Sequence, residues 1–344
     1  MLRPVAEFID SYRIWHKVTF ERGRILRTTD NSWEAFDRPE HYAEPRRVFG
    51  DGDRVPQVSV RPRGGTEVAE VSSFSFPALH RIEGYPYAET NVATGRIYRL
   101  RGARRAPMAV LSHGWAHRGE GGLRAVEVIY VEPLLKAGFS VALLSHPFHF
   151  ERTPAGTYSG ELMVSGDVVL TVEAFRQSVA DLVGLVNWLR GSGDAVVGLV
   201  GYSLGGYLAA LVACLRDDLD FVVIGAAGGS VVSPILDTGL GVNVREDLAS
   251  TGMDHREQLE RAWGIISPER LSLRVDSRKV LLVAGRYDRI MLRDSVVRLW
   301  EKWGRPPISW EDQGHYTLLA VPGRLVRRSL VLLREVALQA GATS

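Results

Sequence analysis

The chain has 344 residues, of which 45% are hydrophobic and 24% are charged. This composition is typical of a globular protein and excludes the disordered, collagen-like and disulfide-rich classes. The formal net charge of +2 gives no strong field toward nucleic acid or an anionic membrane, so neither is an expected partner. The single cysteine, Cys214, excludes a disulfide within the chain and a metal site built from thiolates.

Residues 1–105 are predicted to form an N-terminal extension. A helix is expected at 4–18, followed by segments punctuated by Pro, Gly and Arg that favour short antiparallel strands. Charged residues interrupt the helix, which therefore lacks the continuous apolar core of a signal peptide. No apolar run approaches the roughly 18 residues that span a bilayer. We therefore expect a soluble, cytoplasmic protein without a transmembrane segment.

Residues 106–344 show a different pattern, in which short, continuously apolar runs alternate with helical stretches. Such runs are typical of parallel strands that are covered on both faces. Repeated strand–helix units with right-handed crossovers predict a doubly wound, mostly parallel α/β sheet. The expected strands lie at 108–112, 139–144, 196–200, 221–224, 280–284 and 308–310, and the expected helices at 125–137, 170–190, 204–215, 294–303 and 318–339.

One interval between expected strands, at about 230–278, is too long for a simple loop. It contains a helical stretch at 256–263 and several apolar residues. A helical insertion at this place in an α/β domain is expected to form a lid over the substrate site.

The sharpest motif is Gly201-Tyr202-Ser203-Leu204-Gly205, which lies between an expected strand and an expected helix. In a nucleophile elbow of this G-x-S-x-G form, the serine occupies a strained strand-to-helix turn. Glycines are needed two residues to either side because a Cβ atom there would collide with neighbouring backbone. A helix-capping serine in a glycine-rich turn is the structural alternative.

With this elbow and its flanking elements, the sequence resembles the α/β-hydrolase fold over about residues 107–339. In that family an acid follows a late strand and a histidine follows the last strand. Asp288 and His315 stand at these two places, downstream of Ser203. The resemblance therefore implies a catalytic triad of Ser203, Asp288 and His315. Asp312 is the main substitute for Asp288.

The chemistry expected of these residues follows from their proton affinities. Serine alone is too weakly acidic to attack a carbonyl, and neutral His315 can take the Ser203 proton. Asp288 would fix the imidazole tautomer and stabilise the imidazolium that forms.

The segment Ser112-His113-Gly114-Trp115 resembles the His-Gly motif of the family. The resemblance implies that the N–H groups of Trp115 and Leu204 form the oxyanion hole. Leu204 also stands at a helix N-terminus, whose dipole favours negative charge. His113 would order this loop.

Further polar residues are expected at the same edge of the sheet, where ligands bind. The expected substrate-binding residues are His113, Tyr202, His146 and Arg152. Arg152 is a candidate for binding an acidic substrate group, with a structural arginine as the alternative. A metal site among the histidines is disfavoured because no carboxylate at ligand spacing accompanies them. No cofactor or metal is expected.

These features predict a serine hydrolase that cleaves a small-molecule carboxylic ester through an acyl-enzyme. Aminopeptidase, lipid deacylase and acyltransferase activities on the same triad stay open. From another class, a catalytically inactive α/β-hydrolase domain that binds a ligand or a protein also stays open. A homodimer remains open because an N-terminal extension can serve as a dimer contact.

Overall fold

The computed structural model describes residues 3–20, 32–50, 52–103, 105–115, 119–319 and 331. The strands within these residues are β1 (Ser59–Gly65), β2 (Ala69–Pro77), β3 (Val92–Leu100), β4 (Met108–Ser112), β5 (Ser140–Ser145), β6 (Val197–Tyr202), β7 (Val222–Gly225), β8 (Val280–Gly285) and β9 (Ile308–Glu311). The helices are α1 (Arg3–Phe20), α2 (Pro39–Ala43), α3 (Arg46–Phe49), α4 (Gly119–Val126), α5 (Glu132–Lys136), α6 (Val168–Gly191), α7 (Leu204–Leu215), α8 (Val232–Leu236), α9 (Val242–Ser250), α10 (Arg256–Ala262), α11 (Arg293–Lys302) and α12 (His315–Leu319).

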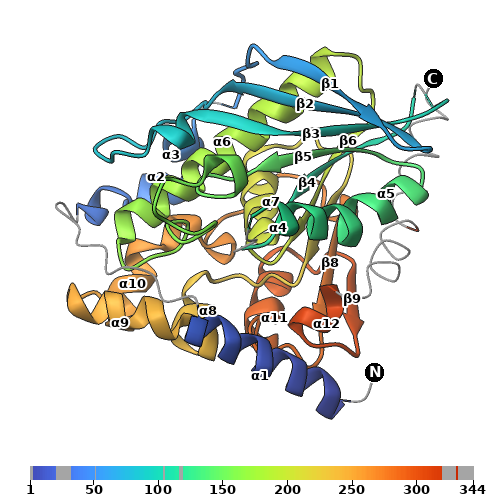
Figure 1. The fold of residues 1–344 in the computed structure, drawn as a ribbon. Coiled ribbons are helices and arrows are strands. Elements are labelled where there is room, and N and C mark those ends of the chain that lie inside the picture. The colour runs from blue at the N-terminus through green and yellow to red at the C-terminus, as the bar shows by residue number, and fades with distance from the viewer. Residues whose placement is uncertain are drawn as a thin grey trace.

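The strands form one sheet with the order β1-β2-β3-β5-β4-β6-β7-β8-β9 (Figure 1). Every pair from β5 to β9 in this order is parallel, whereas β1, β2 and β3 add antiparallel strands at one end. The architecture is a mostly parallel α/β sheet with flanking helices and confirms the predicted α/β-hydrolase fold. The predicted helix at 318–339 overlaps the end of α12, and of its remainder only residue 331 lies among the described residues.

The central strands are buried along their whole length because helices cover both faces of the sheet. Along β4 the side chains alternate between two hydrophobic clusters. Met108 and Val110 join the cluster that contains α6 and α7, and Ala109 and Leu111 join the one that contains residues of α4 and α5. A continuous apolar run therefore supplies both halves of the core.

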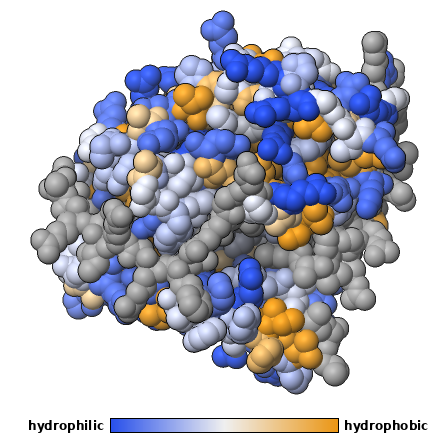
Figure 2. Space-filling view, in the orientation of Figure 1, coloured by the Kyte–Doolittle hydropathy of each residue, from blue (hydrophilic) through white to orange (hydrophobic). Residues whose placement is uncertain are grey.

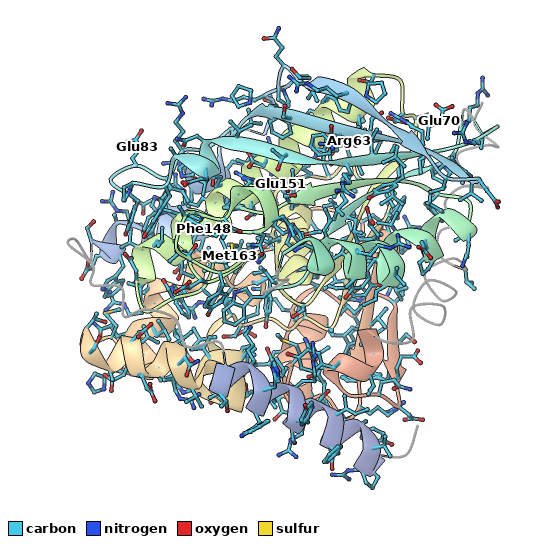
Figure 3. The ribbon with its side chains drawn as sticks, in the orientation of Figure 1. Arg63, Glu70, Glu83, Phe148, Glu151 and Met163 are labelled. Carbon is cyan, nitrogen blue, oxygen red and sulfur yellow. The ribbon has the colours of Figure 1, made fainter. Side chains whose placement is uncertain are left out.

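The N-terminal strands extend the same sheet. β3 pairs with β5 from Thr94 opposite Ser145 to Tyr98 opposite Val141. All seven residues of the edge strand β1 are exposed, and Figure 3 shows Arg63 and Glu70 on the outer strands. The sequence on the N-terminal side of residue 105 thus contributes three strands to the common sheet.

The segment between β7 and β8 is helical and includes α8, the 3₁₀ turn η5 (Gly239–Gly241), α9 and α10. Its apolar side chains Trp263, Ile265 and Ile266 are fully buried in the main core cluster. The Trp263 indole N–H also donates to the Val168 carbonyl oxygen at 3.2 Å. These residues hold the segment on the sheet domain.

Helix α1 lies against α12 and η5 (Figure 1). Its residues Ala6 and Asp10 are fully buried. The opposite face exposes Val5, Phe8 and Tyr12, and Figure 2 shows apolar side chains at this edge of the molecule. The helix therefore docks through the side that carries Asp10. No helix among the described ranges is both long and apolar enough to cross a membrane.

Candidate active site

Ser203 stands at the turn between β6 and α7. Its backbone has φ 54° and ψ −119°, a positive φ that residues with a side chain rarely adopt. A Cβ atom on Gly201 would lie 2.1 Å from the carbonyl oxygen of Gly205, and one on Gly205 would lie 2.0 Å from that of Ser112. Only glycine fits at these two positions. The tight turn leaves Ser203 partly exposed at its tip.

The side chain of His315 lies between those of Ser203 and Asp288. Its Nε2 atom is 3.1 Å from Ser203 Oγ, and its Nδ1 atom is 2.9 Å from Asp288 Oδ2. The other Asp288 oxygen accepts the backbone N–H groups of Ile290 at 2.8 Å and Met291 at 2.7 Å. These bonds aim Asp288 Oδ2 at the imidazole. The structure thus brings together the serine, acid and histidine that the sequence analysis singled out.

Asp312, the alternative acid, lies elsewhere. Its carboxylate is 3.2 Å from the Arg286 guanidinium, and its side chain is 65% exposed. No hydrogen bond joins it to His315 among the contacts of the described residues. Asp288 is therefore the acid that meets the histidine.

The hydrogen bonds define the proton positions at His315. Because Asp288 accepts from Nδ1, that nitrogen carries the proton, and the lone pair on Nε2 accepts from the Ser203 hydroxyl. Burial lowers the pKa of His315, but Asp288 and the nearby charge of Asp10 outweigh it, so the pKa is raised overall. The arrangement can remove the Ser203 proton.

The loop after β4 lies close to the start of α7. A Cβ atom on Gly205 would lie 2.0 Å from the carbonyl oxygen of Ser112 and 2.6 Å from that of His113. Leu204 opens α7, and the N–H group of a first helical residue has no acceptor within its own helix. Trp115 is held by its indole N–H, which donates to Gly160 O at 2.7 Å. The oxyanion-binding role of the Leu204 and Trp115 N–H groups stays a prediction.

A cluster of buried histidines joins the loops after β4 and β5. The ring centroids of His113 and His146 are 4.5 Å apart, and those of His113 and His149 are 4.9 Å apart. His113 Nδ1 donates to Gly114 O at 2.8 Å, which leaves Nε2 to accept the His146 backbone N–H at 3.2 Å. Burial lowers the pKa of His146, whose Nε2 lies 2.8 Å from Ser112 Oγ. Both rings are fully buried, so the structure does not place His113 or His146 where a substrate would contact them.

The structure corrects the expectation that Arg152 binds a substrate group. Its side chain is fully buried, and its Nη1 atom lies 3.0 Å from a carboxylate oxygen of Asp181, which is also fully buried. The guanidinium further donates to the carbonyl oxygens of Ser145 at 2.9 Å and Thr90 at 2.6 Å. Because its charge is neutralised inside the protein, Arg152 has a structural role.

Tyr202 also differs from the expectation of a substrate-binding residue. Its ring stacks on that of Tyr130 with centroids 4.6 Å apart, inside the cluster beside α4 and α5. Only 2% of the residue is exposed. The alternation of side chains along β6 turns Tyr202 into the core, so it is unavailable to a substrate.

Sequence reasoning missed Asp10, the buried carboxylate of α1. It accepts the backbone N–H of His315 at 2.7 Å and therefore belongs to the site. The only sequence signal is an acidic residue within an amphipathic helix, and this pattern does not reveal a partner 305 residues away.

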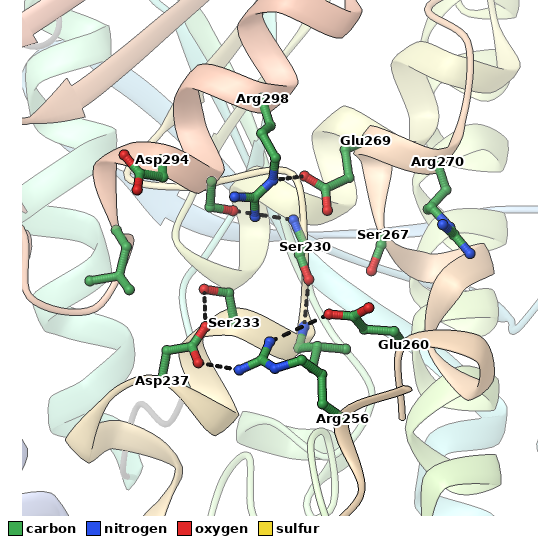
Figure 4. A pocket seen from close by; sticks show the side chains of 13 residues that line it. Ser230, Ser233, Asp237, Arg256, Glu260, Ser267, Glu269, Arg270, Asp294 and Arg298 are labelled. Atoms are coloured by element: carbon green, nitrogen blue, oxygen red, sulfur yellow. Dashed lines mark hydrogen bonds and ion pairs between the residues drawn. The ribbon is translucent and has the colours of Figure 1, made fainter. Parts of the chain in front are cut away.

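A separate cavity of about 380 Å³ lies between the helical segment after β7 and α11 (Figure 4). Two of its three lining arginines face carboxylates: Arg298 lies 3.1 Å from Glu269, and Arg256 lies 3.4 Å from Glu260. Ser203, Asp288 and His315 are absent from its lining residues. The cavity is therefore distinct from the site around Ser203.

Sequence comparison supports the assignment of the fold. The family model "Alpha/beta hydrolase domain containing 18" matches residues 97–231, which contain Ser203. The chain is 32% identical over 180 residues to the uncharacterized protein Rv2627c of Mycobacterium tuberculosis (strain H37Rv), a match that covers 52% of this chain and 42% of that protein. It is 30% identical over 95 residues to the uncharacterized protein YdjC of Bacillus subtilis (strain 168), covering 28% of this chain and 81% of that protein. The match thus spans less than half the length of the mycobacterial relative.

Solved structures share the fold over most of the chain. Acetyl xylan esterase 1 from Thermoanaerobacterium sp. JW/SL YS485 superposes with a TM-score of 0.56 at 17% identity, covering 83% of this chain and 93% of that one. The acetyl xylan esterase from Paenibacillus sp. R4 gives a TM-score of 0.59 at 13% identity, covering 91% and 98%. At such identities the similarity concerns the fold.

Proposed function

Since this chain belongs to the α/β-hydrolase superfamily, we propose that it is a serine hydrolase that cleaves carboxylic esters through an acyl-enzyme. The single observation that carries the proposal is the hydrogen-bonded chain from Ser203 Oγ through His315 to Asp288, with distances of 3.1 and 2.9 Å. The strained backbone at Ser203 supports it, because this conformation presents the hydroxyl at the edge of the sheet.

In the first half of the reaction, Ser203 Oγ attacks the ester carbonyl and its proton passes to His315 Nε2. The negative charge that develops on the carbonyl oxygen rests on the N–H groups of Leu204 and Trp115. The imidazolium, stabilised by Asp288, then gives its proton to the departing alkoxide. The acyl group stays on Ser203.

The second half repeats these steps with water as the nucleophile. His315 Nε2 takes a proton from the water, whose oxygen attacks the acyl carbon. The tetrahedral intermediate collapses, the carboxylic acid leaves, and the proton returns from His315 to Ser203 Oγ. The enzyme is regenerated without a change in oxidation state.

Carboxylic esters are the first substrates to test because two acetyl xylan esterases share the fold. The test measures hydrolysis of p-nitrophenyl esters from acetate to palmitate by the wild type and by Ser203→Ala, with EDTA as a control. Ser192→Ala is a matched variant, since Ser192 is an exposed serine at the end of α6. Activity that Ser203→Ala retains in full contradicts the proposal.

A further inference from the structure

Resting on the proposed function, we propose that Asp10 is a positioning residue that holds His315 and Asp288 in register for proton transfer. Asp10 lies on α1, whereas the two residues that it would position follow β8 and β9 near the other end of the chain. Its carboxylate contacts the backbone of both loops.

The Asp10 carboxylate binds three backbone N–H groups. Its Oδ2 atom accepts from His315 at 2.7 Å and from Arg289 at 3.3 Å, and its Oδ1 atom accepts from Tyr316 at 3.0 Å. Arg289 directly follows Asp288 in the chain. One carboxylate therefore connects the backbone beside the acid with the backbone of the histidine.

Burial and the neighbouring charge of Asp288 raise the pKa of Asp10, and the N–H groups of Tyr316 and His315 act against them by favouring its ionised form. His315 and Tyr316 open α12, where the first N–H groups have no acceptor within the helix. Asp10 accepts them from another helix and so caps α12. Bonds from N–H groups to a carboxylate are about twice as strong as bonds between neutral groups. Removal of the carboxylate leaves buried donors without an acceptor.

The loop is packed closely against this carboxylate. A Cβ atom on Gly314 would lie 2.5 Å from Asp10 Oδ2, so a side chain at 314 would displace either the loop or Asp10. Gly314 precedes His315. A shift of the Asp10 carboxylate is therefore transmitted directly to the histidine backbone.

Other contacts keep α1 docked. The Arg13 guanidinium lies 5.1 Å from the centroid of the Tyr316 ring, and Ile14 packs against Gly239 of η5. The amide of Asn243 donates to the Val18 carbonyl oxygen at 3.3 Å. Since these contacts do not involve Asp10, we expect α1 to stay in place when only this carboxylate is changed.

Asp10 also acts on His315 through its charge. The charged groups that face His315 are Asp288 on the loop after β8, and Asp10 and Lys17 on α1. Asp288 and Asp10 raise the pKa of His315, whereas burial and Lys17 lower it. Loss of the Asp10 charge should therefore lower this pKa. A residue that supports the fold without facing the imidazole would leave this pKa unchanged.

The experiment measures the rate at which a fluorophosphonate labels Ser203 between about pH 5 and about pH 9. The variants are Asp10→Asn, which removes the charge, and Asp10→Glu, which keeps the charge but moves the carboxylate. Glu7→Gln is the matched control, because Glu7 is on the same helix and its side chain pairs with Arg3 at 2.9 Å.

For Asp10→Asn we expect labelling about 10 to 100 times slower and a pH midpoint below that of the wild type. For Asp10→Glu we expect slower labelling with a midpoint close to that of the wild type. Glu7→Gln should match the wild type in both. Thermal unfolding checks that each variant is folded. If Asp10→Asn does not fold, the labelling rate of Asp10→Glu tests the positioning role.

Two results would overturn the positioning role of Asp10 and leave the proposed function intact. The first is labelling at the wild-type rate in the folded Asp10 variants. The second is slower labelling of Asp10→Asn without a shift of its pH midpoint. A wild-type protein in which Ser203 is not labelled overturns the proposed function, and the role of Asp10 with it. The two failures are thus distinguishable.

Discussion

Asp288 and His315 follow neighbouring parallel strands, and their side chains meet at 2.9 Å, from Asp288 Oδ2 to His315 Nδ1. Because the carboxyl ends of parallel strands lie at one edge of a sheet, β8 and β9 deliver the acid and the histidine to the same place. The loops after these strands carry the two partners of Ser203.

Replacing this acid should reduce turnover strongly. We expect Asp288→Asn to lower kcat by about 10³ to 10⁴-fold, because the amide favours the wrong imidazole tautomer and cannot stabilise the imidazolium. Asp312→Asn is the matched control and should stay within about 2-fold of the wild type, since Asp312 faces Arg286. Ester hydrolysis under saturating substrate checks both, and equal losses would contradict the assignment of the acid.

The pH dependence follows from the protonation of His315. Its pKa is raised above the ordinary histidine value of about 6.5, and only the neutral form can accept the Ser203 proton. We therefore expect kcat/KM to fall as the pH drops, with its midpoint above about 6.5. The pH profile of kcat/KM measures this midpoint. A midpoint well below that value would contradict the reading of the site.

The same raised pKa affects stability in the opposite direction. The folded state binds the His315 proton more tightly than the unfolded chain does. The contribution of this protonation to the free energy of unfolding is therefore complete below the pKa that His315 has in the unfolded chain. It is lost as the pH rises through the folded pKa. Activity and the His315 contribution to stability therefore change in opposite senses across this range.

The elbow should not tolerate a side chain at its second glycine. A Cβ atom in Gly205→Ala would lie 2.0 Å from the backbone oxygen of Ser112, and we expect the free energy of unfolding to fall by several kcal/mol. Gly191→Ala in α6 is the control because nothing lies within 4 Å of its added Cβ. We expect that change to be neutral or stabilising by up to about 1 kcal/mol. Thermal unfolding compares the two, and equal stability would argue against the tight turn.

The buried ion pair between Arg152 and Asp181 gives a test of the corrected role. We expect Asp181→Ala to reduce the free energy of unfolding by about 3 to 5 kcal/mol, because it leaves a buried guanidinium charge without its partner. Glu70→Ala breaks the exposed ion pair with Arg101 and should change the free energy of unfolding by less than about 1 kcal/mol. Urea unfolding measures both. An Arg152→Met variant of unchanged stability but raised KM would restore Arg152 as a substrate ligand.

The sequence predicted the parts of the site that local pattern and chain order determine. Continuous apolar runs indicated the buried strands, and the residues that follow them are Ser203, Asp288 and His315. Pairing between remote segments was not predictable. Asp10 looks like an ordinary helical acid until α1 docks on α12, and Arg152 looks available until Asp181 on α6 neutralises it. Phe148 and Met163, which are labelled in Figure 3, are fully buried. Their burial also depends on packing between segments that are remote in sequence.

The most direct test of the central claim is the rate of p-nitrophenyl ester hydrolysis by the wild type and by Ser203→Ala, together with identification of the residue that a fluorophosphonate labels. We predict turnover by the wild type, a fall of at least about 10³-fold in the variant, and labelling at Ser203. Ester hydrolysis that persists in Ser203→Ala, or labelling at another residue, would contradict it.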